Sequence, residues 1–417
     1  MNPLLLSGFG INFNVDKRRL QIKQTDNVIE FYPHHIPYDS IIIDGHYGSI
    51  SFEAMRWLSK HDVSLVLLNW NGNLLSVTQP QEMLNADLKI KQYGKYLDPE
   101  SRLYIADQIV KQKIKSSIIL INELSKFNDI DLTTINKEIQ RVDYDNINNL
   151  MMYEGRIASA YWTELSKIFN GLAPDFHFET RKNLSYSWNI NASDPVNALL
   201  NYGYAILESM VRKDINAIGL DVSIGYLHEI APSKHPLVYD LQELFRYVVD
   251  YSVIELLEMK LKRSDFITTE NYHIRLRPDT AKLLIEKIKN NFNKRYEFRN
   301  KQHTLDNIMF ENVRELDKYI SGKTKALDFK IPDIEISRND TIGVKNKIMP
   351  IGPEKRNALK INKSTLWYQQ KKIKEGKTIK MYKKIKMKIK MKIISNNLIQ
   401  NKLESMLVRG DLKLCIV

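Results

Sequence analysis

The stretch that decides the fold covers residues 40–72 and reads SIIIDGHYGSISFEAMRWLSKHDVSLVLLNWNG. A short apolar run, Ser40 to Asp44, is typical of a strand, and Phe52 to His61 shows helical spacing before a second apolar run. Asn71-Gly72 is a strong hairpin signal because both residues tolerate positive φ. The stretch predicts a small β-rich unit that contains one helix.

Earlier residues carry the same strand signature. Short apolar runs separated by turn residues occur at Leu4 to Leu6, Ile11 to Val15, Leu20 to Lys23 and Val28 to Tyr32. Gln79-Pro80 closes the unit. We therefore predict an N-terminal β-sandwich-like domain at residues 1–80.

Residues 83–320 have a different pattern, with apolar residues at three- and four-residue spacing. Asp98-Pro99 and Asp194-Pro195 each place a capping acid before a proline at the first helical position. The predicted helices are 83–96, 99–127, 133–142, 145–170, 195–214, 240–260, 277–292 and 302–320. The chain is thus predicted to be an α+β multidomain protein with a central all-α domain, followed by a linker at 321–350 and a C-terminal segment at 351–417.

The positive charge of the chain lies almost entirely in the C-terminal segment. From residue 351 onward, 18 Lys and Arg residues face four acidic ones, a net charge of +14, while residues 1–350 carry a net charge of −1. This partition favours a polyanionic partner, nucleic acid first and an acidic membrane surface second. The alternative is a solvated lysine tail, and composition does not separate the two.

Other features restrict the class of protein. The longest apolar runs are far shorter than the ~20 residues that span a bilayer. The N-terminus, MNPLLLSGFG, does not read as a signal peptide. Cys415 is the single cysteine, which excludes an internal disulfide and a thiolate metal cluster. We expect a cytoplasmic protein with no membrane partner.

Candidate chemistry gathers in the segment GYLHEIAPSKHPLVYDLQELFR. His228 lies in a predicted loop, Asp240 opens a predicted helix, and Glu243 follows one turn later. Residues three apart share a helix face, so Asp240 and Glu243 can point at one ion that His228 also reaches. From these residues alone, a capping box formed by Asp240 and Glu243 is the better explanation. Likewise, a lone His228 is more often a satisfied histidine than a ligand, and Glu154 is one glutamate on an amphipathic helix.

The order of several segments favours a metal site over these structural explanations. They are LLLSGFGINFNVD, the 40–72 stretch, YEGRIASAYW, DPVNALLNYGYAIL, GYLHE and YDLQELFR. Read in this order, they resemble the integrase family that inserts spacers into CRISPR arrays, over about residues 1–320. The resemblance implies that Glu154, His228 and Glu243 are metal ligands and that Asp240 is an accessory catalytic acid. Asn201 and Tyr202, with Asn197 and Tyr204, match a helix that packs behind the site.

The resemblance also implies a reaction. Two carboxylates and one imidazole suit Mn²⁺ or Mg²⁺, and the ion would stabilise charge on the oxygens of a phosphodiester. A DNA 3′-hydroxyl as nucleophile gives strand transfer, and water in its place gives nicking. The expected partners are double-stranded DNA and further copies of the chain, as a homodimer or larger homo-oligomer paired through the β domain.

The C-terminal segment resembles a DNA-binding module. EKRNALKINKSTLWYQQKKIKEG resembles a helix-turn-helix whose second helix is capped by Ser364, although Lys360 stands where glycine is common. Six residues in and after that turn are the predicted DNA contacts: Lys363, Ser364, Thr365, Lys371, Lys372 and Lys374.

This appendage, together with LLNWNGNLL in the first domain, resembles the casposases, which are stand-alone transposon integrases of the same family. Some archaeal CRISPR integrases carry a comparable tail. The alternative is a CRISPR spacer integrase that acts with a small partner protein. A third hypothesis, from another class, is a non-catalytic DNA-binding scaffold.

Overall fold

The computed structural model describes residues 2–24, 27–69, 71–78, 85–181, 192–269, 273–334 and 336. The chain divides into two units at residue 335, and the fold described below is that of the first unit, residues 1–335. The predicted helix-turn-helix, the lysine-rich tail and all six predicted DNA contacts lie outside the described residues.

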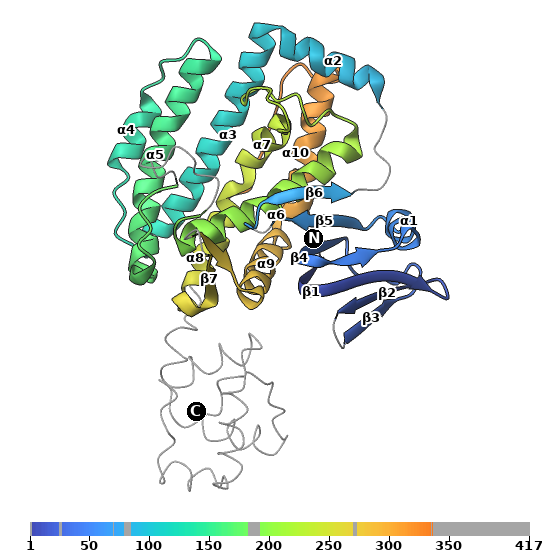
Figure 1. Ribbon diagram of the computed structural model, residues 1–417. Coiled ribbons are helices and arrows are strands. Elements are labelled where there is room, and N and C mark those ends of the chain that lie inside the picture. Colours follow the sequence, from blue (N-terminus) through green and yellow to red (C-terminus); the bar gives the residue numbers. More distant parts are fainter. Residues whose placement is uncertain are drawn as a thin grey trace, which may run out of the picture. The chain divides into compact units, whose positions relative to one another are not determined.

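The N-terminal strands join into one mixed six-stranded sheet with the order β3-β2-β1-β4-β5-β6 (Figure 1). The strands are β1 (Pro3–Asp16), β2 (Arg19–Gln24), β3 (Asn27–Phe31), β4 (Ser40–Ile50), β5 (Ser64–Leu68) and β6 (Leu74–Thr78). β4 pairs in parallel with both β1 and β5, and the other pairs are antiparallel. The N-terminal region is therefore β-rich as predicted, with its six strands in one hydrogen-bonded sheet, and its sandwich-like packing stays a prediction.

Helix α1 (Phe52–Lys60) connects β4 to β5 and supplies part of the core of this region. Ser51 caps it by accepting a hydrogen bond from the backbone N–H of Ala54. Ala54, Trp57 and Leu58 pack into the same apolar cluster as the inward residues of β1 and β2. The predicted helix in the 40–72 stretch is confirmed, and its spacing of apolar residues explains which side is buried.

The remaining part is mostly helical. Its helices are α2 (Ala86–Leu97), α3 (Pro99–Ser125), α4 (Thr133–Gln140), α5 (Ile147–Leu172), α6 (Pro195–Ile218), α7 (Pro236–Gln242), α8 (Arg246–Leu257), α9 (Pro278–Phe292) and α10 (Leu305–Ile320). Short 3₁₀ turns lie at η1 (Pro174–Phe176), η2 (Glu243–Phe245) and η3 (Arg263–Asp265). Asp98 and Asp194 cap α3 and α6 as predicted, by accepting from the backbone N–H of Ser101 and Asn197.

Helix α6 is buried along most of its length and is central to the packing of the helical region. It contacts α7, α8, α9 and α10 as well as strand β6. Gly203 lets it approach α8 closely, since a Cβ at this position would lie 2.5 Å from Cγ1 of Val249. On another side, Tyr202 points to the sheet, and its hydroxyl lies 3.4 Å from Oδ2 of Asp44. Helix α6 thus packs against both the sheet and the other helices.

Two hairpins correct the prediction of an all-α region. β7 (Phe266–Thr268) pairs with β8 (Ile274–Leu276), and β9 (Arg295–Phe298) pairs with β10 (Lys301–Thr304). Arg299 and Asn300 adopt positive φ values of 52° and 63°, which is the backbone geometry of a tight hairpin turn. The predicted helix at 302–320 therefore begins only at Leu305, after β10.

The predicted linker at 321–350 is also corrected at its N-terminal end. Leu327, Phe329, Ile331 and Ile334 are buried. The side chain of Asn312 both donates to and accepts from the backbone of Lys330. Because these residues pack on the helical region, that region extends to Ile334.

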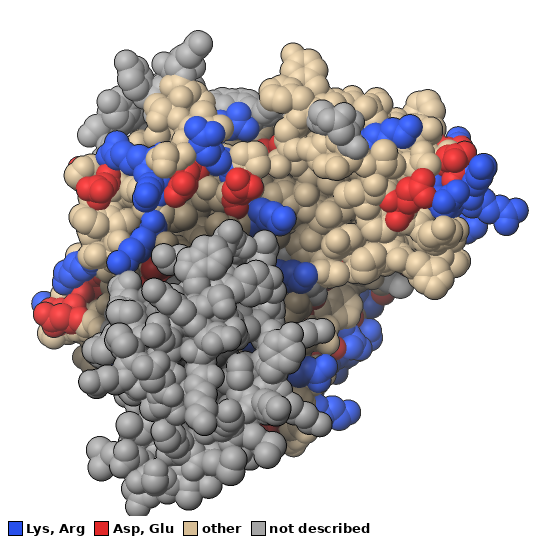
Figure 2. Space-filling view, turned by 90° about the horizontal axis from the view of Figure 1, so that it is seen from below, with Lys and Arg blue, Asp and Glu red and all other residues tan. Residues whose placement is uncertain are grey.

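Charged side chains are mixed on the face that Figure 2 shows, where basic and acidic groups lie next to one another. This agrees with the near-neutral net charge of residues 1–350. Among the described helices, none combines the length and the apolar character needed to span a membrane.

Candidate active site

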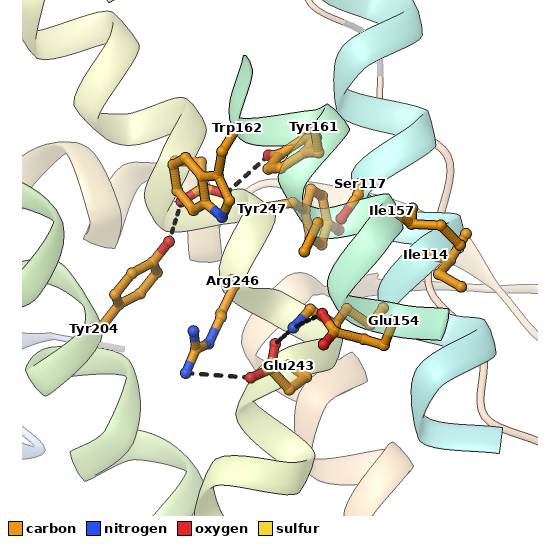
Figure 3. Close-up of a pocket in the computed structure, with 13 residues that line it drawn as sticks. Ile114, Ser117, Glu154, Ile157, Tyr161, Trp162, Tyr204, Glu243, Arg246 and Tyr247 are labelled. Atoms are coloured by element: carbon orange, nitrogen blue, oxygen red, sulfur yellow. Dashed lines mark hydrogen bonds and ion pairs between the residues drawn. The ribbon is translucent and has the colours of Figure 1, made fainter. Parts of the chain in front are cut away.

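A pocket lies where α3, α5, α6 and the η2–α8 segment meet (Figure 3). Charged and aromatic side chains dominate its wall. The lining residues are Lys113, Ile114, Ser117, Glu154, Ile157, Ala158, Tyr161, Trp162, Tyr204, Glu243, Arg246, Tyr247 and Asp250. The pocket brings together two of the three predicted metal ligands, Glu154 and Glu243.

Helix α5 positions Glu154 in the pocket wall because its apolar face packs against the neighbouring helices. Tyr153, Ile157 and Tyr161, four residues apart, are buried. Glu154 lies at the border of this buried stripe, and 19% of its side chain is exposed. The carboxylate therefore enters the pocket while the helix packs against its neighbours.

Glu243 enters the pocket from a break in the helix. The predicted helix at 240–260 is divided into α7, the 3₁₀ turn η2 and α8, and Glu243 is the first residue of η2. Only 3% of its side chain is exposed. Arg246 and Asp250 follow at spacings of three and four residues, so all three charged residues occupy one face. Figure 3 shows Glu154 and Glu243 directed toward one another.

The Lys113 ammonium, from α3, lies between the two carboxylates. Its Nζ is 2.7 Å from Oε1 of Glu154 and 2.6 Å from Oε2 of Glu243. Nη2 of Arg246 lies 3.2 Å from the other oxygen of Glu243. Burial acts to raise the pKa of Glu243, but Arg246 and Lys113 outweigh it and lower this pKa to about 2. Glu243 is ionised at neutral pH.

Asp240 organises the loop that carries His228. Its carboxylate is fully buried and accepts hydrogen bonds from the backbone N–H groups of Tyr226, Leu227 and His228, the last at 3.0 Å. It also lies 2.7 Å from Nδ1 of the His228 ring. A hydrogen bond donated by Nδ1 to this carboxylate leaves Nε2 directed away from Asp240, where it could act as a ligand.

These contacts correct both predictions made for Asp240. Helix α7 begins at Pro236, so Asp240 lies inside a helix and does not form a capping box with Glu243. Nor does it share the face that Glu243 presents to the pocket, because its oxygens are directed to the 226–228 loop. Its position is that of an orienting residue for His228.

The His228 ring stands at the edge of this arrangement, with 34% of its side chain exposed. Burial acts to lower the pKa of His228, but the hydrogen bond to Asp240 and the charges of Asp240 and Glu243 raise it overall. Among the described residues, no three His, Cys, Asp or Glu side chains are close enough together to hold a metal ion.

The chemistry of Glu154, Glu243 and His228 nevertheless fits a divalent cation. Two carboxylates converge on one cationic group, and Oε2 of Glu243 is buried without a hydrogen bond, although it lies within ion-pair distance of Lys113. His228 presents an imidazole in a tautomer that suits metal coordination. Oxygen and nitrogen donors of this kind fit Mn²⁺ or Mg²⁺.

A second buried acid, Asp250, lines the same pocket. Tyr161 donates to it at 2.8 Å, and Tyr204 donates to its other oxygen. Arg181 and Arg246 lie over the Tyr204 ring at 5.2 and 4.9 Å from its centroid. Burial raises the pKa of Asp250 to about 6 despite these partners. The network fixes Arg246 next to Glu243.

The two residues predicted to lie near the site pack elsewhere. Oδ1 of Asn201 accepts from Nη2 of Arg181 at 3.0 Å, and Tyr202 faces the sheet. Both are packing contacts of helix α6. The helix contributes Tyr204 to the pocket instead.

Sequence reasoning missed Lys113, Arg246 and Asp250. The last two were detectable, because they continue the helical spacing that begins at Glu243. Lys113 had no such signal, since it lies on a different helix and only the packing of α3 against α5 and η2 brings it to the acids.

Comparison with known proteins agrees with this architecture. The family model described as CRISPR associated protein Cas1 matches residues 4–290. The chain belongs to the Cas1 family. A Cas1 endonuclease of Francisella tularensis subsp. novicida is 28% identical over 333 residues, which cover 78% of this chain and 97% of the relative. A Cas1 protein of Methanobrevibacter ruminantium is 30% identical over 296 residues, 67% of this chain and 85% of the relative. The family is one of DNA-processing enzymes.

Solved structures extend the likeness. A casposase bound to integration product is 37% identical and superposes with a TM-score of 0.74, covering 84% of this chain and 99% of the other. A Cas1 protein from Thermotoga maritima has the same fold at 20% identity, with a TM-score of 0.66 over 79% of this chain and 100% of that one. The predicted family resemblance is confirmed, and a casposase is among the solved structures that share it.

Gly225 provides a test of how the His228 loop is held. A Cβ at this position would lie 2.7 Å from the backbone of Pro236 and 2.9 Å from Oδ2 of Asp240. We expect Gly225→Ala to lower the free energy of unfolding by roughly 1–3 kcal/mol, because the loop must move away from α7. Urea denaturation measures this change, and NMR of the His228 ring reports the displacement.

The matched control is Gly94→Ala on α2, where an added Cβ meets no atom within 4 Å. This variant should be neutral or more stable by up to about 1 kcal/mol, since alanine favours a helix. Equal stability of the two alanine variants, with an unchanged His228 resonance, would show that the loop does not need the close approach.

Proposed function

We propose that the chain is a metal-dependent DNA integrase that joins 3′-hydroxyl ends of transposon DNA to target DNA by strand transfer, with a nicking activity when water replaces the hydroxyl. One observation carries the proposal: acids from two different helices, Glu154 and Glu243, converge on a single cation in the wall of a pocket. The 37% identity to a casposase bound to integration product supports the assignment to this branch.

Glu154, Glu243 and His228 would hold Mn²⁺ or Mg²⁺ in this proposal. The bound ion would stabilise negative charge on the oxygens of the phosphodiester under attack. The chain's own groups prepare that site. Asp240 fixes the His228 ring with Nδ1 protonated, and Arg246 keeps the buried Glu243 ionised. A carboxylate held ionised and an imidazole held in one tautomer are ready to act as ligands.

DNA is the proposed partner of both parts of the chain. The basic segment after residue 350 would neutralise phosphates, and its helix-turn-helix would contact base edges through Lys363, Ser364 and Thr365, with Lys371, Lys372 and Lys374 following the backbone. We also propose a homodimer or larger assembly of this chain. These roles rest on the sequence, because the segment lies outside the described residues.

A second candidate function is spacer integration into a CRISPR array with a small partner protein. The description of the family model and the names of the curated relatives favour it. The two roles differ in substrate. Element ends with inverted repeats would be joined by a casposase, whereas a repeat array would be the target of a spacer integrase.

Strand transfer by the full chain tests the metal site. With oligonucleotide ends, a supercoiled plasmid and Mn²⁺, wild type should give joined products. Glu154→Gln and Glu243→Gln should each lower the joining rate by more than about 100-fold, because even outer-shell partners of a metal contribute 10–100-fold. Products are quantified on denaturing gels.

Glu164→Gln is the matched control, since Glu164 lies on the same helix α5 and is 6% exposed, but bonds to Asp131 and Lys167 outside the pocket. It should join DNA at nearly the wild-type rate. Joining by the two site variants at the control rate would refute the metal-site assignment. Tight DNA binding without joining by wild type would favour a non-catalytic scaffold.

The basic segment makes a separate prediction about salt. Replacing the 11 lysines between residues 371 and 392 by glutamine should weaken DNA binding and flatten the dependence of log K on log salt. The slope should fall by about 0.9 for each phosphate contact that is lost. Fluorescence anisotropy at several salt concentrations measures it. An unchanged slope would show that the lysines are solvated and do not contact DNA.

A further inference from the structure

We infer that Lys113 is a displaceable cation, whose ammonium occupies the space between Glu154 and Glu243 until a divalent ion takes its place. The inference rests on the proposed function, because it concerns the same two carboxylates. It assigns Lys113 the role of a positioning residue that preserves the site without metal and sets how tightly metal binds.

The ammonium contacts carboxylate oxygens that a metal ion would also use. Nζ of Lys113 lies 2.7 Å from one oxygen of Glu154 and 2.6 Å from one oxygen of Glu243. A small divalent ion binds carboxylate oxygens at about 2.0–2.2 Å. An ion shared by these two carboxylates competes for the same lone pairs, and its charge repels the ammonium at short range.

The remaining oxygen of Glu243 also has a cationic neighbour. Nη2 of Arg246 lies 3.2 Å from it, so both oxygens of this buried carboxylate face a cation. A metal ion bound between the two glutamates would be repelled by both cations at short range, so its binding favours withdrawal of Lys113 or Arg246. The choice between them decides how the site opens.

Arg246 is the less mobile of the two. Its guanidinium lies over the Tyr204 ring at 4.9 Å from the centroid, and Tyr204 is bonded to the buried Asp250. A planar group stacked in this way loses its contact if it rotates. Lys113 has a flexible four-carbon stem. Both side chains reach solvent, with 20% of Lys113 and 32% of Arg246 exposed, so the stacking of Arg246 on Tyr204 is what distinguishes them. Lys113 is the group that withdraws.

This arrangement has two consequences. Without metal, the ammonium keeps two acids with little solvent exposure from repelling each other, so the ligands stay in place. When metal binds, two short ion pairs must break, which weakens the observed affinity. Removing the ammonium should therefore destabilise the metal-free protein and strengthen metal binding.

The experiment measures Mn²⁺ binding to the full chain by calorimetry and by the EPR signal of free Mn²⁺. Lys113→Met should bind Mn²⁺ roughly tenfold or more tightly than wild type, because the uncompensated acids gain a partner. Its Tm in EDTA should lie below that of wild type, and Mn²⁺ should raise it by a larger amount. Lys113→Arg, whose fork can bond both acids at once, should bind Mn²⁺ more weakly than wild type.

Lys111→Met is the matched control, because Lys111 is on the same helix and pairs with Asp107 at 2.6 Å, away from the pocket. Its Mn²⁺ affinity should equal that of wild type. Equal or weaker binding by Lys113→Met overturns the inference, since Lys113 would then support the ligands. If Lys113→Met does not fold, the affinity of Lys113→Arg decides, and an affinity equal to or above that of wild type overturns the inference.

Failure of the proposed function gives a different result. In that case wild type itself binds no Mn²⁺, or Glu154→Gln binds it as well as wild type does. A wild-type site that Glu154→Gln abolishes, together with no gain from Lys113→Met, rejects the inference alone.

Discussion

Burying negative charge is the constraint around which this part of the molecule is built. Glu243 is almost completely removed from solvent, and Asp250 lies in a buried position on α8, seven residues further along the chain. An uncompensated carboxylate in such a place is strongly unfavourable, so each one needs donors or a counter-charge. Lys113 and Arg246 supply the charge for Glu243, while two tyrosine hydroxyls supply hydrogen bonds to Asp250. The helices that bring these partners together are the ones that form the pocket.

A third buried acid, Asp240, also needs donors but obtains them in a different way. Three consecutive backbone N–H groups and the His228 ring satisfy it. A loop without regular structure is thereby fixed against α7, and the imidazole is held near the pocket in a defined tautomer. Gly225 makes this possible because only glycine tolerates the approach of the loop to Pro236 and Asp240. The position of His228 is therefore a consequence of how one acid is buried.

Local signals predicted much of the fold. The cap and proline pairs at Asp98 and Asp194 gave the correct starts of α3 and α6, since capping depends only on neighbouring residues. The strand order was not predictable, because the parallel pairing of β1 with β4 joins segments separated by a hairpin. The β9–β10 hairpin was missed since its turn uses Arg299 and Asn300 in place of a glycine. Burial of Phe329 and Ile331 depends on the helices beneath them, which a fading periodicity does not reveal.

In the site, too, local signals predicted some residues, and tertiary packing determines the others. The ordered family segments led to the prediction of Glu154, His228 and Glu243 as ligands, and two of these line one pocket. Spacing suggested that Asp240 and Glu243 share a face, but the 3₁₀ turn at Glu243 separates their directions. The position of Lys113 between the two acids depends wholly on the packing of α3 against α5 and η2.

The central claim is that Glu154, His228 and Glu243 hold one catalytic ion. Anomalous diffraction from crystals of this protein soaked with Mn²⁺ tests it most directly. The account predicts a single strong peak, coordinated by one oxygen from each glutamate and by Nε2 of His228. A peak coordinated by other residues, or no peak while both glutamates remain paired with Lys113, would contradict it.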